Sequence, residues 1–450
     1  MIAGVLDEQT LHDWVVEQRW FASKSREVAH LNVLDAVALR EEEPQLQVLL
    51  LEARFPTGTH EIYQLPVGVR SSFDEGVIGS GDGRTVYDAA ADPELTRELV
   101  RLIAAGAEHG DVRFTTAEGG PVIGTVSSSR LMGVEQSNTS LVFDERLVLK
   151  VFRRLEPGTN PELEMLRFLT ARGFPHIAAL AGWYEYEGRL VDATLGVLQA
   201  FLAGGRDGWE LTLDEMDGGD AQWERLSDLG RVTGDMHSAL ASDATDPHFA
   251  PEEPSEESLS LLHADVDEQI ERMWRDLPDD DERLADVVGR GEDIRELLHS
   301  LSSVASGGKV IRTHGDYHLG QTMLTDRGWV ILDFEGEPAR PLPERRRKRS
   351  PLRDVAGMLR SFAYAASAQA LLRNTVAPAG WEERARTTFL DAYLEAVDPG
   401  LLPAGRGATD RLLSVFELEK AVYELRYELN NRPDWVAIPA AAIRRLLEAA

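Results

Sequence analysis

The residues best suited to chemistry are two carboxylates and an amide that lie close together in the last third of the sequence. Asp316 follows a glycine in the run Thr313-His314-Gly315-Asp316, and Gln321 comes shortly after it. Asp333 ends the apolar run Val330-Ile331-Leu332. Carboxylate and amide oxygens are ligands for hard divalent cations. We expect the glycine turn to present Asp316 to a substrate, and a buried strand to deliver Asp333.

The spacing of these residues matches a pattern with which protein kinases act on ATP. Protein kinases use H-R-D-x-x-x-x-N followed by D-F-G, in which the first Asp orients the attacking hydroxyl, and the Asn and second Asp hold Mg²⁺. Here Gln321 replaces the Asn, and Asp333-Phe334-Glu335 stands in place of D-F-G. We therefore predict that Asp316 is catalytic and that Gln321 and Asp333 bind Mg²⁺. In the alternative interpretation, Asp316 caps a turn and Asp333 only ends a strand.

A lysine in the first half of the chain meets a second requirement of a nucleotide kinase, a cation for the phosphates. Lys150 lies among apolar neighbours in a predicted strand, Leu147–Phe152. The pair Asn160-Pro161 begins a predicted helix, because Asn is a good N-cap and Pro fits the first helical position. Glu164 on this helix is expected to pair with Lys150, with Glu162 as the alternative. Lys150 could otherwise be an outward-facing strand lysine.

Two further segments supply candidate contacts to the nucleotide. A turn rich in hydroxyl side chains is predicted before the strand at Leu141, and its N–H and hydroxyl groups would meet phosphate oxygens. The predicted strand Gly196–Leu202 ends in Ala203-Gly204-Gly205, which has the composition of a hinge whose backbone can meet an adenine edge. The residues that we expect to contact the nucleotide are Lys150, Glu164, Ser137, Asn138, Thr139, Ser140, Gln199 and Phe201.

The segment Phe416–Asn431 is predicted to be a helix that forms one wall of a sugar site. Apolar residues at positions 418, 422, 425 and 429 have the spacing of a core-facing stripe. The other side carries a lysine and tyrosines, flanked by glutamates, and such a mixture suits sugar hydroxyls and an apolar ring face. The alternative is a surface helix with charge pairs. The residues expected to contact the sugar, besides Asp316, are His318, Lys420, Glu424, Tyr427, Glu428 and Trp435.

The charge balance argues against nucleic acid and membranes as partners. The 450 residues include 77 acidic and 47 basic side chains, and the formal net charge of −30 repels phosphate backbones and anionic lipid surfaces. No cysteine is present, which excludes disulfides, thiol catalysis and thiolate metal sites. Since the N-terminus does not resemble a signal peptide and no stretch is apolar enough to span a bilayer, we expect a cytoplasmic protein. We also expect a monomer.

The order of predicted elements divides the chain into three parts. Residues 1–90 are predicted to form a small α+β cap subdomain, and residues 91–202 a subdomain with the nucleotide-binding sheet. Residues 203–450 are predicted to form a mostly helical lobe with the catalytic loop and the sugar site. In this lobe His237 lies on an amphipathic segment, where we expect a structural rather than a catalytic histidine.

Several longer motifs resemble those of the bacterial maltokinases, which are related to aminoglycoside phosphotransferases and eukaryotic-type kinases. These motifs occur in both halves of the chain, so the resemblance covers most of it. The runs that carry the resemblance are Gln18–Phe21, Gln136–Ser140, His314–Gln321, Asp333–Pro338, Ser350–Met358 and Glu424–Trp435.

The resemblance implies a bilobal, kinase-like α+β fold of the aminoglycoside phosphotransferase type, with an extra N-terminal cap. It implies transfer of phosphate from ATP, with Mg²⁺, to the anomeric hydroxyl of maltose. The product, maltose 1-phosphate, would feed α-glucan (glycogen) synthesis, with trehalose synthase as a pathway partner. One alternative is a glucosamine kinase that forms glucosamine 6-phosphate, in which Glu424 would meet an ammonium. Another is a catalytically silent, kinase-like sugar or nucleotide sensor, against which the presence of Asp316, Gln321, Asp333 and Lys150 argues.

Overall fold

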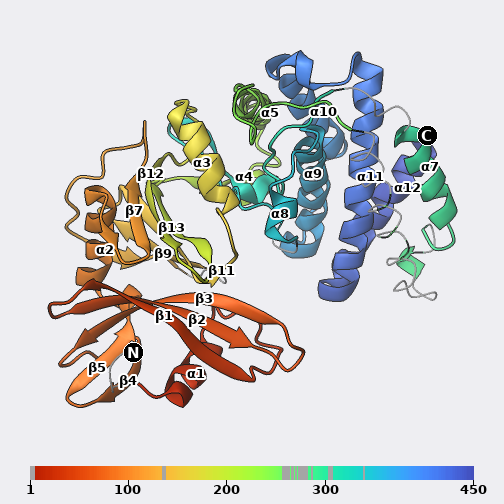
Figure 1. Ribbon diagram of the computed structural model, residues 1–450. Helices are drawn as coiled ribbons and strands as arrows, with labels where there is room; N and C mark the ends of the chain where they lie inside the picture. The colour runs from red at the N-terminus through yellow and green to blue at the C-terminus, as the bar shows by residue number, and fades with distance from the viewer. Residues whose placement is uncertain are drawn as a thin grey trace. The chain divides into compact units, whose positions relative to one another are not determined.

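The computed structural model describes residues 6–133, 138–255, 264, 268, 271, 282–284, 287–302, 308–337 and 340–449 of the chain. Residue contacts divide the chain into two compact units, Met1–Gly204 and Gly205–Ala450. In Figure 1 the first unit runs from red through yellow, and the second from green to blue. The division falls beside the boundary that the sequence suggests between residues 202 and 203.

An antiparallel sheet at the start of unit 1 has a core of its own. In spatial order its strands are β1 (His30–Arg40), β2 (Gln45–Arg54), β3 (His60–Arg70), β5 (Arg84–Asp88) and β4 (Val77–Gly81), and the short β11 (Arg154–Leu155) pairs with β3. The helix α1 (Glu8–Glu17) packs on β1 and β4, and the single turn η1 (Ala89–Ala91) follows β5. Trp20 and Phe21 are buried in this core.

A second antiparallel sheet of unit 1 contains the lysine strand. In spatial order its strands are β6 (Glu108–His109), β7 (Val112–Thr116), β12 (Leu180–Glu187), β13 (Asp192–Ala200), β10 (Leu147–Phe152), β9 (Asn138–Phe143) and β8 (Ser129–Leu131). The strand β10 lies between β13 and β9 and is buried except at Lys150, which is half-buried. A strand with neighbours on both sides explains the apolar run around this lysine.

The two longer helices of unit 1 begin where the capping residues predict. The helix α2 (Pro93–Ala105) starts after Asp92, whose side chain accepts the N–H of Glu94. The helix α3 (Pro161–Ala171) starts after Asn160, whose side chain accepts the N–H of Glu162 at 2.8 Å. In both helices proline occupies the first position. A backbone N–H at this position has no acceptor within the helix, so proline, which lacks an N–H, is tolerated there. The capping prediction for Asn160 is therefore confirmed.

Helices make up most of the described part of unit 2. The helices α5 (Ala221–Leu240) and α10 (Trp381–Ala396) pack on each other, and α9 (Leu352–Arg373) packs on α10 and on α11 (Arg406–Asn431). Figure 1 shows α9 and α11 side by side. The remaining elements are α4 (Gly208–Asp214), α7 (Gly291–Ser302), α8 (Leu342–Arg345), α12 (Ala437–Ala449), η2 (Glu282–Leu284), η3 (Leu319–Gln321), η4 (Pro399–Leu401) and η5 (Pro433–Trp435).

The helix α11 is longer than its prediction, which starts at Phe416. It begins at Arg406, and Thr409, Leu412 and Leu413 are already buried in its first turns. The core-facing stripe therefore extends toward the N-terminus beyond the segment that carries the tyrosines. None of the described helices is long and apolar enough to cross a lipid bilayer.

Candidate active site

A hairpin explains why Gln321 and Asp333 meet. The small sheet of unit 2 consists of β14 (Arg206–Asp207), β15 (Thr322–Thr325) and β16 (Gly328–Ile331). The first residue of β15 pairs with the last of β16, so residues 321 and 333 lie at the same end of an antiparallel pair. The side-chain amide of Gln321 donates to Asp333 Oδ2 at 3.3 Å. Asp333 has a φ of 57°, a left-handed conformation that is uncommon for a residue with a Cβ and often found at functional sites.

His314 connects the loop before Asp316 to the end of β16. Its Nε2 lies 2.8 Å from the carbonyl oxygen of Leu332, and its Nδ1 accepts the N–H of Asp316 at 3.3 Å. One neutral tautomer, with the proton on Nε2, satisfies both bonds. Gly315 has a φ of 87°, which glycine adopts without steric strain. The expected glycine turn is therefore present before Asp316.

A buried carboxylate beneath this loop holds its backbone in place. Asp354 on α9 is 2% exposed and accepts the N–H of His314 at 2.7 Å and that of Gly315 at 3.0 Å. His237 Nε2 on α5 lies 3.1 Å from the same carboxylate, which agrees with a structural role for this histidine. Burial raises the pKa of Asp354, but the hydrogen bond and charge of His237 and the N–H of Gly315 outweigh it, so the net pKa is lowered. Asp354 is therefore ionised at neutral pH.

A glycine on α9 allows the helix to lie against this loop. A Cβ at Gly357 would stand 2.5 Å from the carbonyl oxygen of Tyr317, which is closer than non-bonded atoms approach. Tyr317 is buried, and its hydroxyl forms a hydrogen bond of 2.8 Å with the hydroxyl of Thr233. The helix α9 thus fixes the loop both through Asp354 and through this close contact.

Asp316 lies beside two of the residues predicted to contact the sugar. Its Oδ1 is 3.9 Å from Lys420 Nζ, and its Oδ2 is 4.0 Å from His318 Nε2. The side chain of Asp316 is 28% exposed, so a ligand can reach it. Burial lowers the pKa of His318, Asp316 opposes this shift, and the charge of Lys420 adds to it, with a net lowering. His318 is therefore neutral at pH 7, and Lys420 is the cation closest to Asp316 among these neighbours.

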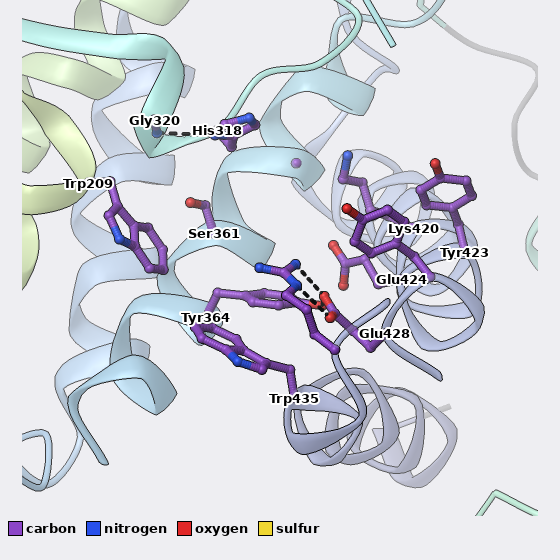
Figure 2. A pocket seen from close by; sticks show the side chains of 13 residues that line it. Trp209, His318, Gly320, Ser361, Tyr364, Lys420, Tyr423, Glu424, Glu428 and Trp435 are labelled. Atoms are coloured by element: carbon purple, nitrogen blue, oxygen red, sulfur yellow. Dashed lines mark hydrogen bonds and ion pairs between the residues drawn. The ribbon is translucent and has the colours of Figure 1, made fainter. Parts of the chain in front are cut away.

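A pocket of about 310 Å³ lies in unit 2 between α9, α11 and the loop at His318. This volume is at the lower end of the range for small-ligand sites, about 300 to 1,000 Å³. Figure 2 shows Trp209, Tyr364 and Trp435 on one side of the pocket, and Lys420 and Tyr423 on the other. The structure brings together around it all the predicted sugar contacts other than Asp316, namely His318, Lys420, Glu424, Tyr427, Glu428 and Trp435.

Both predicted glutamates of the pocket are already hydrogen-bonded. Glu428 is buried, and its two oxygens accept from Tyr364 at 3.0 Å and from Arg432 at 2.6 and 2.9 Å. Glu424 accepts two hydrogen bonds from Arg360 on α9, from Nε at 2.9 Å and from Nη2 at 2.7 Å. Both of these bonds end on Oε2 of Glu424, so Oε1 remains an acceptor for a ligand. Glu428 is therefore a fixed part of the wall.

An aromatic stack forms another side of the pocket. The rings of Trp435 and Tyr364 lie 6.0 Å apart between centroids, with an interplanar angle of 20°. The guanidinium of Arg432 lies 5.0 Å from the Trp435 ring centroid, within the distance of a cation–π contact. Tyr427 is 44% exposed. An apolar ring face can pack on such a surface, as expected for a sugar site.

Lys150 in unit 1 forms an ion pair with Glu162. Its Nζ lies 2.8 Å from Glu162 Oε2, and the two side chains are 12% and 3% exposed. Glu162 lies in the first turn of α3, next to the N-cap Asn160. Glu162, the alternative partner in the sequence, therefore pairs with Lys150, and Glu164 is buried on the same helix. A lysine held by a buried carboxylate is the arrangement that we expect for a phosphate-binding cation.

The predicted turn around residue 138 is partly a strand. Residues 138–140 pair with residues 150–152 of β10 and so belong to β9, which makes the prediction of a turn wrong for Asn138, Thr139 and Ser140. Ser137 lies outside the described residues. The hydroxyl of Thr139 accepts a hydrogen bond of 2.8 Å from Arg153 Nε. As nucleotide contacts, these four residues stay predictions.

The two residues predicted to meet the nucleobase lie at the end of β13. Gln199 pairs with Val148 on one side and with Leu180 on the other. The N–H of Phe201 donates to the carbonyl of Arg146 at 2.8 Å, so this N–H is engaged within the unit. Gln199 and Phe201 also stay predictions as nucleotide contacts.

Sequence reasoning missed several residues that build the pocket. Asp354, Gly357, Ser361 and Tyr364 follow one another on α9 at helical spacing, and the first two lie within a run that resembles the maltokinases. A stripe of polar and small residues on an otherwise apolar helix was a usable signal for this face. Trp209, which follows the hinge-like glycines, offers no such signal. Also missed are Arg432, which lines the pocket, and Arg360, which pairs with Glu424 from outside the lining.

The fold and these features define a kinase-type phosphotransferase, with a lysine-bearing sheet in one unit and a carboxylate loop in a helical unit. Residues 130–399 match the family model described as "Phosphotransferase enzyme family". Because this match spans more than half of the chain, the chain belongs to the phosphotransferase enzyme family. Residues 14–92 match the model described as "Maltokinase N-terminal cap domain". The predicted fold class, an α+β kinase-like fold with a cap and a helical C-terminal part, is thereby confirmed.

Known relatives include two bacterial glucosamine kinases. The chain is 28% identical over 343 residues to a glucosamine kinase of Streptacidiphilus jiangxiensis, covering 72% of this chain and 74% of that protein. It is 26% identical over 348 residues to a glucosamine kinase of Mycolicibacterium smegmatis, covering 72% and 81%. A solved structure of a glucosamine kinase in complex with glucosamine, ADP and inorganic phosphate has a similar fold, with a TM-score of 0.72, 22% identity, and coverage of 97% and 98%.

Proposed function

We propose that this protein is an ATP-dependent sugar kinase that phosphorylates maltose at its anomeric hydroxyl. The observation that carries this proposal is the pocket in unit 2, where six predicted sugar contacts line one cavity. Asp316 lies beside two of them, Lys420 and His318. An acceptor for a hydroxyl proton thus stands next to a cavity that offers charged hydrogen-bonding groups and aromatic faces.

In the proposed mechanism Asp316 aligns the sugar hydroxyl and accepts its proton. A carboxylate is a weak base, so we expect the proton to move late, once the oxygen has begun to bond to phosphorus. His314 and Asp354 hold the backbone on which Asp316 stands. Catalysis of this kind depends mainly on alignment and charge stabilisation.

Gln321 and Asp333 are proposed to hold Mg²⁺. The amide of Gln321 contacts the carboxylate of Asp333 at 3.3 Å, so two oxygen-bearing groups of the kind that Mg²⁺ prefers are adjacent. When bound, the ion would neutralise charge on the phosphate oxygens. Lys150, held by Glu162, is proposed to bind phosphate oxygens of ATP in unit 1, together with the predicted contacts of β9 and β13.

Two sugars compete for the assignment of the substrate. The match of residues 14–92 to the maltokinase cap domain supports maltose. The names of the relatives support glucosamine, at identities of 28% and 26% over most of the chain. With maltose as substrate, the product would enter α-glucan synthesis, with trehalose synthase as the pathway partner that the resemblance implies.

An ADP-release assay with ATP and Mg²⁺ tests this function directly. Maltose, glucose and glucosamine are compared side by side at equal concentrations. We expect the highest kcat/KM with maltose. A higher kcat/KM with glucosamine would assign the enzyme to the second substrate, and ADP release that no sugar stimulates would reject the sugar kinase.

A further inference from the structure

We propose that the buried residue Arg360 makes the pocket selective for neutral sugars over protonated amino sugars. This inference rests on the proposed function, because it concerns which sugar enters the same pocket. It assigns the selectivity to the pairing of Glu424 with Arg360, a residue outside the lining of the cavity. Arg360 would thus be a specificity-determining residue that acts through Glu424.

The pair of Arg360 and Glu424 is buried and has well-defined geometry. The side chain of Arg360 is 1% exposed and that of Glu424 is 12% exposed. The Nε and Nη2 atoms donate to the same oxygen, Glu424 Oε2, at 2.9 and 2.7 Å. Arg360 Nη1 is buried and has no hydrogen-bond partner among the described residues. The guanidinium therefore compensates the charge of Glu424 from the side of α9, while Oε1 can still accept a sugar hydroxyl.

The other carboxylates at the pocket also face cations. Glu428 is paired with Arg432 at 2.6 Å, and Asp316 lies 3.9 Å from Lys420. Together with Glu424 and Arg360, these are three carboxylates, each with a cation nearby. His318 adds no charge at neutral pH, because burial and Lys420 lower its pKa.

An ammonium group would gain little in this surrounding. A buried charge must be paired, otherwise the loss of its hydration opposes binding. Each carboxylate that could receive an ammonium already has a cation nearby, and that cation would repel a second positive charge. A hydroxyl at the same place loses less hydration and can donate to Glu424 Oε1. The pocket should therefore bind glucose better than protonated glucosamine, which has the same shape.

The wild-type protein tests this through the pH dependence of the two sugars. The amine of a sugar titrates near an α-amino group, about 7.7 to 8.0. We expect the ratio of kcat/KM for glucosamine to that for glucose to rise about tenfold per pH unit below this value and to level off above it. If one of the two sugars binds without being turned over, its inhibition constant is measured in competition with a sugar that the enzyme does phosphorylate. The ratio of the two binding constants should then show the same pH dependence. A ratio that stays constant from pH 6 to 9 overturns the proposal.

The charged and titratable groups near the Arg360–Glu424 pair must not confound this pH series. They are Tyr364 on α9, and Glu417 and Glu428 on α11. Glu417 is itself paired with Arg386 on α10 at 2.8 Å. Burial, with the charges of Glu424 and Glu428, raises the pKa of Tyr364, and burial with Glu337 raises that of Tyr423. Neither tyrosine therefore ionises in the measured range.

A pair of matched variants provides the second test. Arg360→Gln removes the cation that pairs with Glu424. Arg386→Gln is the matched control, because Arg386 pairs with Glu417, a buried glutamate of α11 that does not line the pocket. At pH 7 we expect Arg360→Gln to shift the ratio toward glucosamine at least tenfold, and Arg386→Gln to leave it within twofold. An unchanged ratio in Arg360→Gln, or equal shifts in both variants, overturns the proposal.

If Arg360→Gln does not fold, the wild-type pH series decides the question. If neither sugar is turned over or bound, the proposed function fails rather than the selectivity.

Discussion

Replacing Asp354 by asparagine tests whether the loop before Asp316 must be held by its buried carboxylate. The carboxylate of Asp354 accepts the N–H groups of His314 and Gly315 at 2.7 and 3.0 Å. An asparagine offers one oxygen and one N–H₂ group, so one of the two backbone N–H groups loses its acceptor. A buried, unsatisfied donor costs about 1 to 3 kcal/mol. At about 1.36 kcal/mol per factor of ten, this corresponds to about a 5- to 150-fold decrease in kcat.

The assay for this variant measures kcat, KM for ATP, and melting temperature together. We expect kcat to fall in the stated range while KM for ATP, set in our account by Lys150 and its neighbours, changes less than threefold. Asp391→Asn is the control, because Asp391 is a surface residue whose partner, Arg406 at 3.1 Å, is exposed as well. A variant Asp354→Asn with a lower melting temperature but a kcat within twofold of the wild type would refute the reasoning, since Asp354 would then only stabilise the fold.

Three further predictions follow from the same structure. Glu162→Gln should raise KM for ATP about tenfold in the ADP-release assay, because Glu162 pairs with Lys150 at 2.8 Å. Glu428→Gln should lower the free energy of unfolding in urea by about 1 to 3 kcal/mol, since it loses a charged acceptor of Arg432. Because folding lowers the pKa of Asp354, its ionised carboxylate stabilises the folded state. This contribution is complete above the unfolded-state pKa, about 3.9, and is lost as the pH falls through the lower folded-state pKa. Asp354→Asn should therefore flatten the loss of stability below about pH 4 in pH-dependent unfolding.

Local signals in the sequence were sufficient for much of the fold. Asp92 and Asn160 start helices where their side chains cap the first N–H groups. The apolar run around Lys150 is a strand with neighbours on both sides. The sequence did not reveal that residues 138–140 are a strand, because their hydroxyl-rich composition is typical of turns. Their pairing with β10 is a tertiary contact that local composition does not contain.

The candidate site was predictable where the chemistry depends on spacing along the chain. A hairpin of short strands brings Gln321 and Asp333 together, and one face of α11 carries most of the pocket residues expected there. The partners of those residues come from another helix. Arg360 and Tyr364 on α9 reach Glu424 and Glu428 across a helix packing, and single-sequence patterns do not specify which buried ions pair between helices.

We propose above all that Asp316 aligns and deprotonates the hydroxyl of a sugar that is bound in the neighbouring pocket. The most direct measurement is ³¹P NMR of the products formed from maltose, ATP and Mg²⁺ by the wild type and by Asp316→Asn, together with a titration of ATP binding. Our account predicts maltose 1-phosphate from the wild type, no phosphorylated sugar from Asp316→Asn, and similar ATP binding by both. Formation of the phosphorylated sugar by Asp316→Asn at the wild-type rate would contradict it.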